Sequence, residues 1–257
     1  MDNASADDTA AMVAARHPGV TLVANGANLG YAAANNQGIA AATGSHVLLL
    51  NPDIVVHEGA LDTLVQFLQD HPSAGAVAPR LILPDGSVQA SCRSFPTPDV
   101  VLYEALGFSR LFSRSRRFGK YRMTWWDYDD ERRVDQPMAS AILVRGEALR
   151  QVGGMDEQFP IFFNDVDLCR RLWDGGWDVW YTPNASMDHV GGASTRQVRR
   201  EMIAESHRSF LAFYRKHYAG EIAWWQYAVA VGLLCVGYLA RVIAHGLRSR
   251  FCGAPAD

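Results

Sequence analysis

The apolar and polar positions of the first eighty residues follow the pattern of an α/β fold. Helix-forming residues at 10–16 and the apolar residues of 20–23 predict a helix and then a strand, separated by a Pro-Gly turn. An Ala-rich helix over 30–42, a strand over 46–50 and an amphipathic helix over 58–70 follow. This alternation, with short connections, favours a mainly parallel sheet with helices on both faces.

Two acidic segments lie where the pattern predicts the edge of this sheet and the start of a helix. The apolar run Val47–Leu50 ends in Asn51-Pro52-Asp53, so a buried strand would deliver Asp53 to the sheet edge where open α/β sheets bind ligands. Much later, an aromatic pair leads into Asp165 and Asp167 at the start of a helix. One carboxylate could hold a metal ion and another could accept a proton.

A second apolar feature is the run over 222–240, which only Gln226 interrupts. Aromatic residues precede it and arginines follow it, as at a membrane interface. This length is compatible with a membrane span, with a re-entrant or in-plane helix, and with a helix packed against the rest of the protein. Arginines after the run favour a cytoplasmic C-terminus, which conflicts with a single crossing from a cytoplasmic domain, so peripheral or monotopic attachment is preferred. We therefore expect residues 219–257 to form a membrane-associated helix and tail.

Composition narrows the classes of function. The 257-residue chain can bury one large core, and its net charge of −3 gives no reason to expect nucleic acid as a partner. The four cysteines lack metal-binding spacing, which fits a reducing cytoplasm. A basic and aromatic segment over 108–126 is either a solvated loop or a contact for anionic lipid or a lipid diphosphate.

Several ordered blocks together resemble the inverting family 2 glycosyltransferases with a GT-A fold, in their rhamnosyltransferase-like branch. The blocks are Asp2-Asn3-Ala4-Ser5, residues 28–38, Asn51-Pro52-Asp53, Gly153-Gly154-Met155-Asp156, Asn164-Asp165-Val166-Asp167 and residues 189–195. The resemblance implies a GT-A domain over 1–218, with a nucleotide half to about residue 80 and an acceptor half over 81–218. Relatives carry an apolar strand and helix before the first block, and this chain begins within that block.

The resemblance also implies roles for individual residues. Asp53 and His189 would bind a divalent metal, Mg²⁺ or Mn²⁺, that neutralises a departing diphosphate. Asp53 could instead cap a following helix, and a lone His is often structural. Ser194 and Thr195 could contact phosphate oxygens or be ordinary turn residues.

Asp165 is the predicted general base, because it matches the second residue of the family's Glu-Asp pair. Asn164 replaces the Glu, which should lower the pKa of Asp165 relative to a paired arrangement. Asp167 is a competing base, although capping or bracing its helix is its expected task. Ser140 replaces a Gly that relatives usually carry, which leaves acceptor preference open.

A further set of residues resembles the nucleotide-binding blocks. Gly30 would let backbone approach a ligand closely. For Asn28, an ordinary role in the turn between a strand and a helix is an equal alternative. The full set of expected nucleotide-binding residues is Asp2, Asn3, Asn28, Gly30, Asn35 and Asn51.

These readings predict a metal-dependent inverting glycosyltransferase at the cytoplasmic face of the membrane. It would transfer a sugar, rhamnose from dTDP-rhamnose, to a lipid-linked or cell-envelope glycan. A binding or scaffold role for an inactive, truncated GT-A remnant is the main alternative. A nucleotidyltransferase is disfavoured because the chain lacks a Gly-rich, Lys-bearing phosphate loop.

Overall fold

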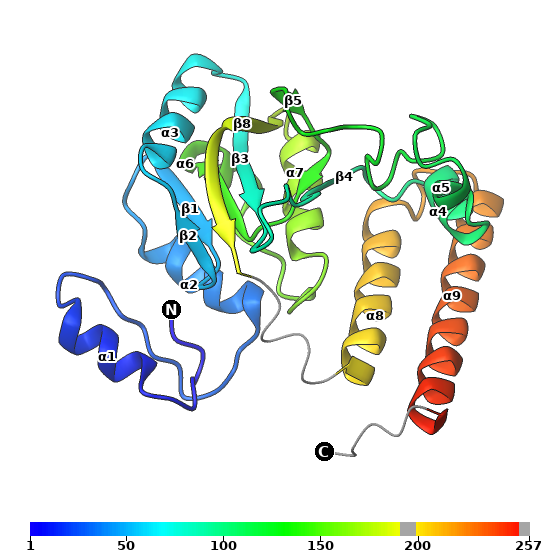
Figure 1. Ribbon diagram of the computed structural model, residues 1–257, viewed down its shortest axis with the longest axis horizontal. Helices are drawn as coiled ribbons and strands as arrows, with labels where there is room; N and C mark the ends of the chain where they lie inside the picture. The colour runs from blue at the N-terminus through cyan, green and yellow to red at the C-terminus, as the bar shows by residue number, and fades with distance from the viewer. Residues whose placement is uncertain (191–198, 252–257) are drawn as a thin grey trace.

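A mixed β-sheet flanked by helices forms the body of the protein (Figure 1). The structure is a computed structural model that describes residues 1–190 and 199–251. The sheet has the strand order β1-β7-β3-β8-β2, and β5 pairs with β8. These strands are β1 (His46–Leu50), β2 (Ile54–Val56), β3 (Ala74–Ile82), β5 (Arg132–Arg133), β7 (Ala141–Arg145) and β8 (Asp178–His189).

Strand directions in this sheet are mixed. β3 and β8 pair in parallel, whereas β7 pairs antiparallel with both β1 and β3, and β8 pairs antiparallel with β2 and β5. β1, β3 and β8 therefore run in one direction, with β7 inserted between the first two. Parallel pairing is consequently less extensive than the strand-helix alternation suggested. A separate two-stranded sheet joins β4 (Cys92–Arg93) to β6 (Gln136–Pro137).

Helices cover both faces of the sheet, as predicted, and two apolar clusters fill the space. On one face, α3 (Ala60–Asp70) packs Leu64 and Leu68 against Val77 and Met187 of the sheet. On the other face lie α2 (Tyr31–Ala41), α6 (Gly146–Val152) and α7 (Asn164–Asp174). Continuous burial along most of β3 explains its unbroken apolar sequence, because both of its faces are covered.

The local predictions for the first eighty residues are confirmed with one exception. The predicted helices correspond to α1 (Thr9–Arg16), α2 and α3, and the predicted strand over 46–50 is β1. The strand expected over 20–23 is wrong. Only an isolated bridge between Asp2 and Ala24 forms there, and Val20 is exposed, because no neighbouring strand in the described chain offers this segment a ladder of hydrogen bonds.

The second part of the chain adds a helical layer beside the sheet (Figure 1). Here α4 (Pro98–Ala105), α5 (Phe108–Leu111), α8 (Arg199–His217) and α9 (Trp224–Phe251) gather, and α8 and α9 lie side by side. Val101, Phe213, Tyr214, Ala230 and Leu234 belong to the apolar cluster that joins them. The predicted C-terminal apolar helix is thus confirmed, and it packs against the rest of the chain along one side only.

Candidate active site

The end of the sheet brings Asp53 and His189 together, although 136 positions separate them in the sequence. The antiparallel register of β2 and β8 places Ile54 opposite His189, and Val190 N–H donates to the Asp53 carbonyl at 3.0 Å. As a result, His189 Nε2 lies 3.5 Å from Asp53 Oδ2. His189 is almost fully buried, which holds the ring in place.

Gln89 fixes the orientation of the His189 ring. Its Oε1 lies 2.7 Å from His189 Nδ1, which can donate to this amide oxygen, and the other ring nitrogen, Nε2, faces Asp53. Histidines that bind metal ions commonly have such a partner on their second nitrogen. Sequence reasoning missed Gln89, because a lone Gln in a loop carries no signal of its own.

Two buried oxygens beside this pair are without hydrogen-bond partners among the described residues. They are Asp53 Oδ1 and Asn51 Oδ1. Unsatisfied buried acceptors are costly, and a cation would satisfy both. The donor set, two side-chain oxygens and one imidazole nitrogen, therefore fits a divalent metal. The described residues hold no group of three or more His, Cys, Asp or Glu, so further ligands would come from a diphosphate or water.

We call Asn51, Asp53 and His189 the metal-side corner. A short backbone segment, Ala139 and Ser140, lies between this corner and Asp165 and bonds both Asn51 and Asp165. Ser140 C=O accepts from Asn51 N–H at 2.8 Å, while Ala139 N–H donates to Asp165 Oδ2 at 3.3 Å. The Tyr31 hydroxyl of α2 donates to the Ala139 carbonyl at 2.9 Å. The predicted base Asp165 and Asn51, which lies two positions before the predicted metal ligand Asp53, thus bond adjacent residues of one dipeptide.

Asp165 sits in the first turn of α7 in surroundings suited to a base. Its Oδ1 accepts from Val166 N–H at 2.8 Å. Burial raises the pKa of this carboxyl above its usual value, against the lowering effect of the backbone N–H groups of Ala139, Val166 and Asp165 itself. A raised pKa makes a carboxylate a better proton acceptor. Burial, reinforced by the charge of Asp165, also raises the pKa of Tyr31, which therefore stays a neutral donor.

Asn164, which stands where the family has Glu, has a donating role in this structure. Its Nδ2 lies 2.8 Å from the Ile161 carbonyl and 3.3 Å from the Phe159 carbonyl. A carboxylate has no hydrogen to donate to these acceptors. The preceding residue, Phe163, begins α7 with φ 67°, a strained conformation of the kind found near functional sites.

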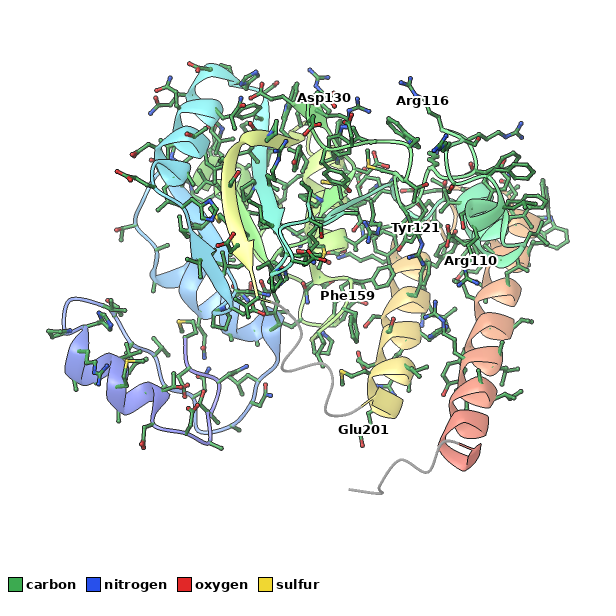
Figure 2. The ribbon with its side chains drawn as sticks, in the orientation of Figure 1. Arg110, Arg116, Tyr121, Asp130, Phe159 and Glu201 are labelled. Atoms are coloured by element: carbon green, nitrogen blue, oxygen red, sulfur yellow. The ribbon has the colours of Figure 1, made fainter. Side chains whose placement is uncertain are left out.

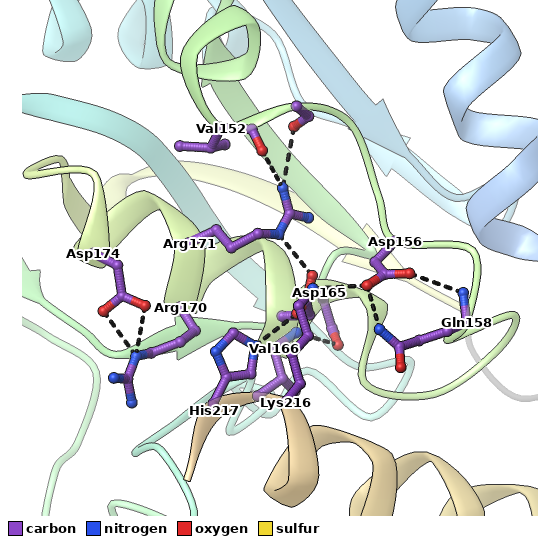
Figure 3. Close-up of polar contacts among 12 residues, drawn as sticks. Val152, Asp156, Gln158, Asp165, Val166, Arg170, Arg171, Asp174, Lys216 and His217 are labelled. Carbon is purple, nitrogen blue, oxygen red and sulfur yellow. Dashed lines mark hydrogen bonds and ion pairs between the residues drawn. The ribbon is translucent and has the colours of Figure 1, made fainter. Parts of the chain in front are cut away.

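Asp167 is fully buried and is surrounded by two cationic side chains and a histidine. Its Oδ1 lies 2.7 Å from both Lys216 Nζ and His217 Nε2, and its Oδ2 lies 2.7 Å from Arg171 Nε. Figure 3 shows these partners converging from α7 and from the end of α8. We refer to these four residues as the Asp167 cluster. Since both oxygens are engaged, Asp167 braces the site and does not face an acceptor.

The Asp167 cluster also positions the Gly153-Gly154-Met155-Asp156 loop. Arg171 donates to the carbonyls of Val152 and Gly154, each at 2.7 Å. Figure 3 shows Arg171 reaching the Val152 carbonyl, and Lys216 lies 2.7 Å from Asp156 Oδ2. Asn36 of α2 completes the arrangement by bonding the Met155 backbone. Sequence reasoning missed Lys216 and His217, because charged residues at the end of a helix usually face water.

The expected nucleotide-binding residues fall into two groups. The first group is Asp2, Asn3, Asn28 and Gly30. The Asn3 side chain holds it together by bonding Asn28 Oδ1 at 3.0 Å and the Gly30 carbonyl at 3.1 Å, and Asp2 is adjacent to Asn3 in sequence. Asn51 belongs with the metal-side corner, and the Asn35 amide bonds the Tyr31 carbonyl within α2. Gly30 (φ 87°) is close to the Pro160 backbone, so its need for glycine has a packing reason. Ser194 and Thr195 lie outside the described residues.

Comparison with known proteins agrees with this fold. Residues 1–130 match the family described as Glycosyl transferase family 2. Over 239 residues the chain is 33% identical to the N-acetylglucosaminyl-diphospho-decaprenol L-rhamnosyltransferase of Mycobacterium tuberculosis. The matched region covers 88% of this chain and 75% of that protein.

Solved structures show the same fold at lower identity. The mannosyltransferase PcManGT of Pyrobaculum calidifontis, solved with GDP-Man and Mn²⁺, superposes with a TM-score of 0.52 at 18% identity, over 97% of this chain and 70% of that one. GalNAc-T7, solved with UDP, GalNAc and Mn²⁺, gives 0.50 at 13% identity, over 74% and 36% of the two chains. The protein therefore has a GT-A-like fold and is a glycosyltransferase. It belongs to glycosyl transferase family 2, as the rhamnosyltransferase-like motifs suggested.

The Asp167 cluster makes stability depend on pH. Its hydrogen bonds with His217, Lys216 and Arg171 outweigh the opposing effect of burial and lower the pKa of Asp167 to about 2. Because this pKa is below that of the unfolded chain, the stabilisation is present above about pH 4 and is lost as pH falls towards 2. We expect Asp167→Asn to lower the free energy of unfolding by about 2–3 kcal/mol at pH 7 and to flatten its decline between pH 4 and 2, measured by urea denaturation.

Asp174→Asn on the same helix is the matched control. Asp174 is half exposed and pairs with Arg170, so we expect a change below about 0.5 kcal/mol. Equal losses in the two variants would contradict a special role for Asp167.

Proposed function

We propose that this glycosyltransferase is a metal-dependent inverting enzyme that transfers rhamnose from dTDP-rhamnose to a lipid-linked glycan acceptor. The observation that supports the proposal is that Asp165 bonds Ala139 and Asn51 bonds the adjacent Ser140, while Asp53, two positions after Asn51, lies 3.5 Å from His189. The rhamnosyl donor and the lipid-linked acceptor are taken from the Mycobacterium tuberculosis relative, whose name specifies an N-acetylglucosaminyl-diphospho-decaprenol.

In the proposed reaction, Asp165 removes the proton from the acceptor hydroxyl. The freed oxygen forms a bond to C1 of the sugar as the bond from C1 to the nucleoside diphosphate breaks, and the diphosphate leaves with the electron pair. Asp53 and His189, with Asn51, would hold a Mg²⁺ or Mn²⁺ ion, which when bound offsets the charge of the diphosphate. Asp2, Asn3, Asn28, Gly30 and Asn35 are proposed to contact the nucleoside.

The C-terminal residues 219–257 are proposed to attach the 1–218 domain to the cytoplasmic face of the membrane. Within the described chain, Trp224–Ala244 is one helix long and apolar enough to cross a bilayer. Its outer side carries exposed apolar residues at helical spacing, which we call the α9 stripe: Trp225, Val229, Val236, Leu239 and Ile243. The opposite side packs Ala230 and Leu234 against the domain. A helix with one packed and one exposed apolar side suits a position in the membrane surface.

Nucleotide binding tests the metal-side corner. We expect calorimetric titration with dTDP to show binding that requires Mn²⁺ or Mg²⁺, and weaker binding of UDP. Asp53→Asn should weaken metal-dependent dTDP binding at least about tenfold, because it removes the anionic ligand and leaves an amide. Asp188→Asn is the control, since Asp188 is next to His189 but is exposed and pairs with His57 at 3.0 Å.

Metal-independent binding of dTDP would overturn the metal assignment. A folded sample that binds neither nucleotide would favour the alternative of an inactive binding or scaffold protein.

Catalysis tests the base. Asp165→Asn should lower the transfer rate by about 10²–10⁴-fold and change dTDP affinity only a few-fold, because the amide cannot accept the proton. In the wild type, the rate should fall on the acid side as Asp165 becomes protonated, at a higher pH than an ordinary carboxyl near 3.9 would give. Steady-state kinetics across pH, with Asp174→Asn as control, measure both effects. An unchanged rate in Asp165→Asn would exclude the base assignment.

Membrane attachment can be tested with two matched surface positions. Val236 in the α9 stripe and Val20 near the N-terminus are 63% and 59% exposed. We expect Val236→Glu to weaken partition onto phosphatidylcholine–phosphatidylglycerol vesicles about tenfold or more, since it puts a charge in the apolar contact. Val20→Glu should leave partition unchanged in the same co-sedimentation assay. Equal partition of the two variants would contradict attachment through α9.

A further inference from the structure

A cavity of about 490 Å³ lies between α4, α5, α8 and α9, in the acceptor half of the protein. Apolar side chains form part of its lining, among them Val100, Val101, Phe163, Phe210, Leu233 and Leu234. Its volume is within the roughly 300–1,000 Å³ that is usual for small-molecule sites. None of the proposed donor-binding residues lines it.

Basic side chains line the same cavity. They are Arg110 from α5, Arg122 from the following loop and Arg241 from α9, all three exposed enough to meet a ligand. Figure 2 shows Arg110 and Tyr121 on the α5–α8–α9 side of the molecule. Arg122 is 3.5 Å from Glu104 Oε2, which offsets its charge. Among the described residues no ion pair is recorded for Arg110 or Arg241, so these two are available to an anion.

The other polar residues of the lining do not supply positive charge. Burial, together with the nearby charge of Arg241, lowers the pKa of His207, so this ring is neutral at pH 7. Glu104 Oε1 is buried without a partner in the described chain, and it could accept a hydrogen bond from a hydroxyl. The cavity lining thus combines apolar side chains, two arginines without a recorded ion pair among the described residues, and the unsatisfied carboxyl oxygen of Glu104.

One end of the cavity approaches the predicted base. Phe163 lines it and begins α7, two positions before Asp165. Tyr121 also lines it, and the charges of both Glu104 and Asp165 act on its pKa, which burial raises. The opposite side is formed by Leu233, Gly237 and Arg241 of α9, the helix whose outer side carries the α9 stripe.

We propose that this cavity binds the isoprenoid diphosphate portion of the acceptor, with its first apolar carbons against α4, α8 and α9 and its diphosphate between Arg110 and Arg241. This inference rests on the proposed function for the identity of the acceptor. An amphiphile with an anionic head matches both the apolar lining and the charge. The cavity is lined both by α9 and by Phe163, the residue that precedes α7, so a lipid bound beside α9 would have its head group on the side of the helix start that carries Asp165.

The probe is farnesyl diphosphate, a short isoprenoid diphosphate, titrated by calorimetry without nucleotide and with a chelator present. We expect saturable binding, with inorganic pyrophosphate and farnesol each at least about tenfold weaker, because each supplies only half of the contacts. Arg110→Gln combined with Arg241→Gln should weaken farnesyl diphosphate binding at least about tenfold. Arg114→Gln, an exposed arginine of the same segment that does not line the cavity, is the control.

Filling the cavity gives a second, independent variant. A Cβ added at Gly237 meets no atom within 4 Å, so Gly237→Phe can enter the space without a backbone clash and should abolish probe binding. Gly232→Phe is the matched control, because Gly232 is also in α9, also has no atom within 4 Å of an added Cβ, and does not line the cavity. Thermal melts of both variants verify that they fold.

Three results would overturn the proposal: no binding of farnesyl diphosphate to the wild type, unchanged binding in Gly237→Phe or the double arginine variant, or equally tight binding of pyrophosphate. These outcomes are separate from those for the donor. Failure of metal-dependent dTDP binding or of sugar transfer would count against the proposed function while probe binding persisted, and the reverse pattern would count against the cavity alone.

Discussion

One buried carboxylate, Asp167, holds the acceptor half together. Without partners it would be too costly to bury, but Arg171, Lys216 and His217 surround it and keep it ionised. The same cations reach onward, since Arg171 binds the Val152 and Gly154 carbonyls and Lys216 binds Asp156. The contacts of this one charge therefore tie the end of α8 and the 153–156 loop to α7, beside the apolar packing of Phe213 and Tyr214.

This bracing explains how two acids two positions apart in one helix differ in chemistry. Asp167 points into the protein, meets cations and has a depressed pKa. Asp165 meets only N–H donors of Ala139 and Val166, and burial raises its pKa. The environment, rather than residue type, thus assigns one carboxylate to structure and leaves the other suited to accept a proton.

The helical layer joins this chemistry to an apolar surface. α9 packs one side on the domain and exposes the α9 stripe on the other, while the cavity beneath it opens towards the start of α7. For the basic segment over 108–126, the sequence left two possibilities, a solvated loop or a contact for an anion. Different arginines of this segment have different surroundings in the structure. Arg116 lies over the Trp125 ring, whereas Arg110 lines the cavity.

The sequence by itself determined the elements whose signals are local: the helices with apolar periodicity, the strand before Asp53, the acidic start of α7 and the apolar C-terminal helix. The strand over 20–23 failed because a strand needs a partner, and pairing is not encoded in one segment. Only the tertiary structure brought His189 to Asp53, placed Gln89 behind it and buried Lys216 and His217 against Asp167. The physical reason is that these contacts join residues roughly 50–140 positions apart, and register and packing, not local propensity, decide which side chains meet.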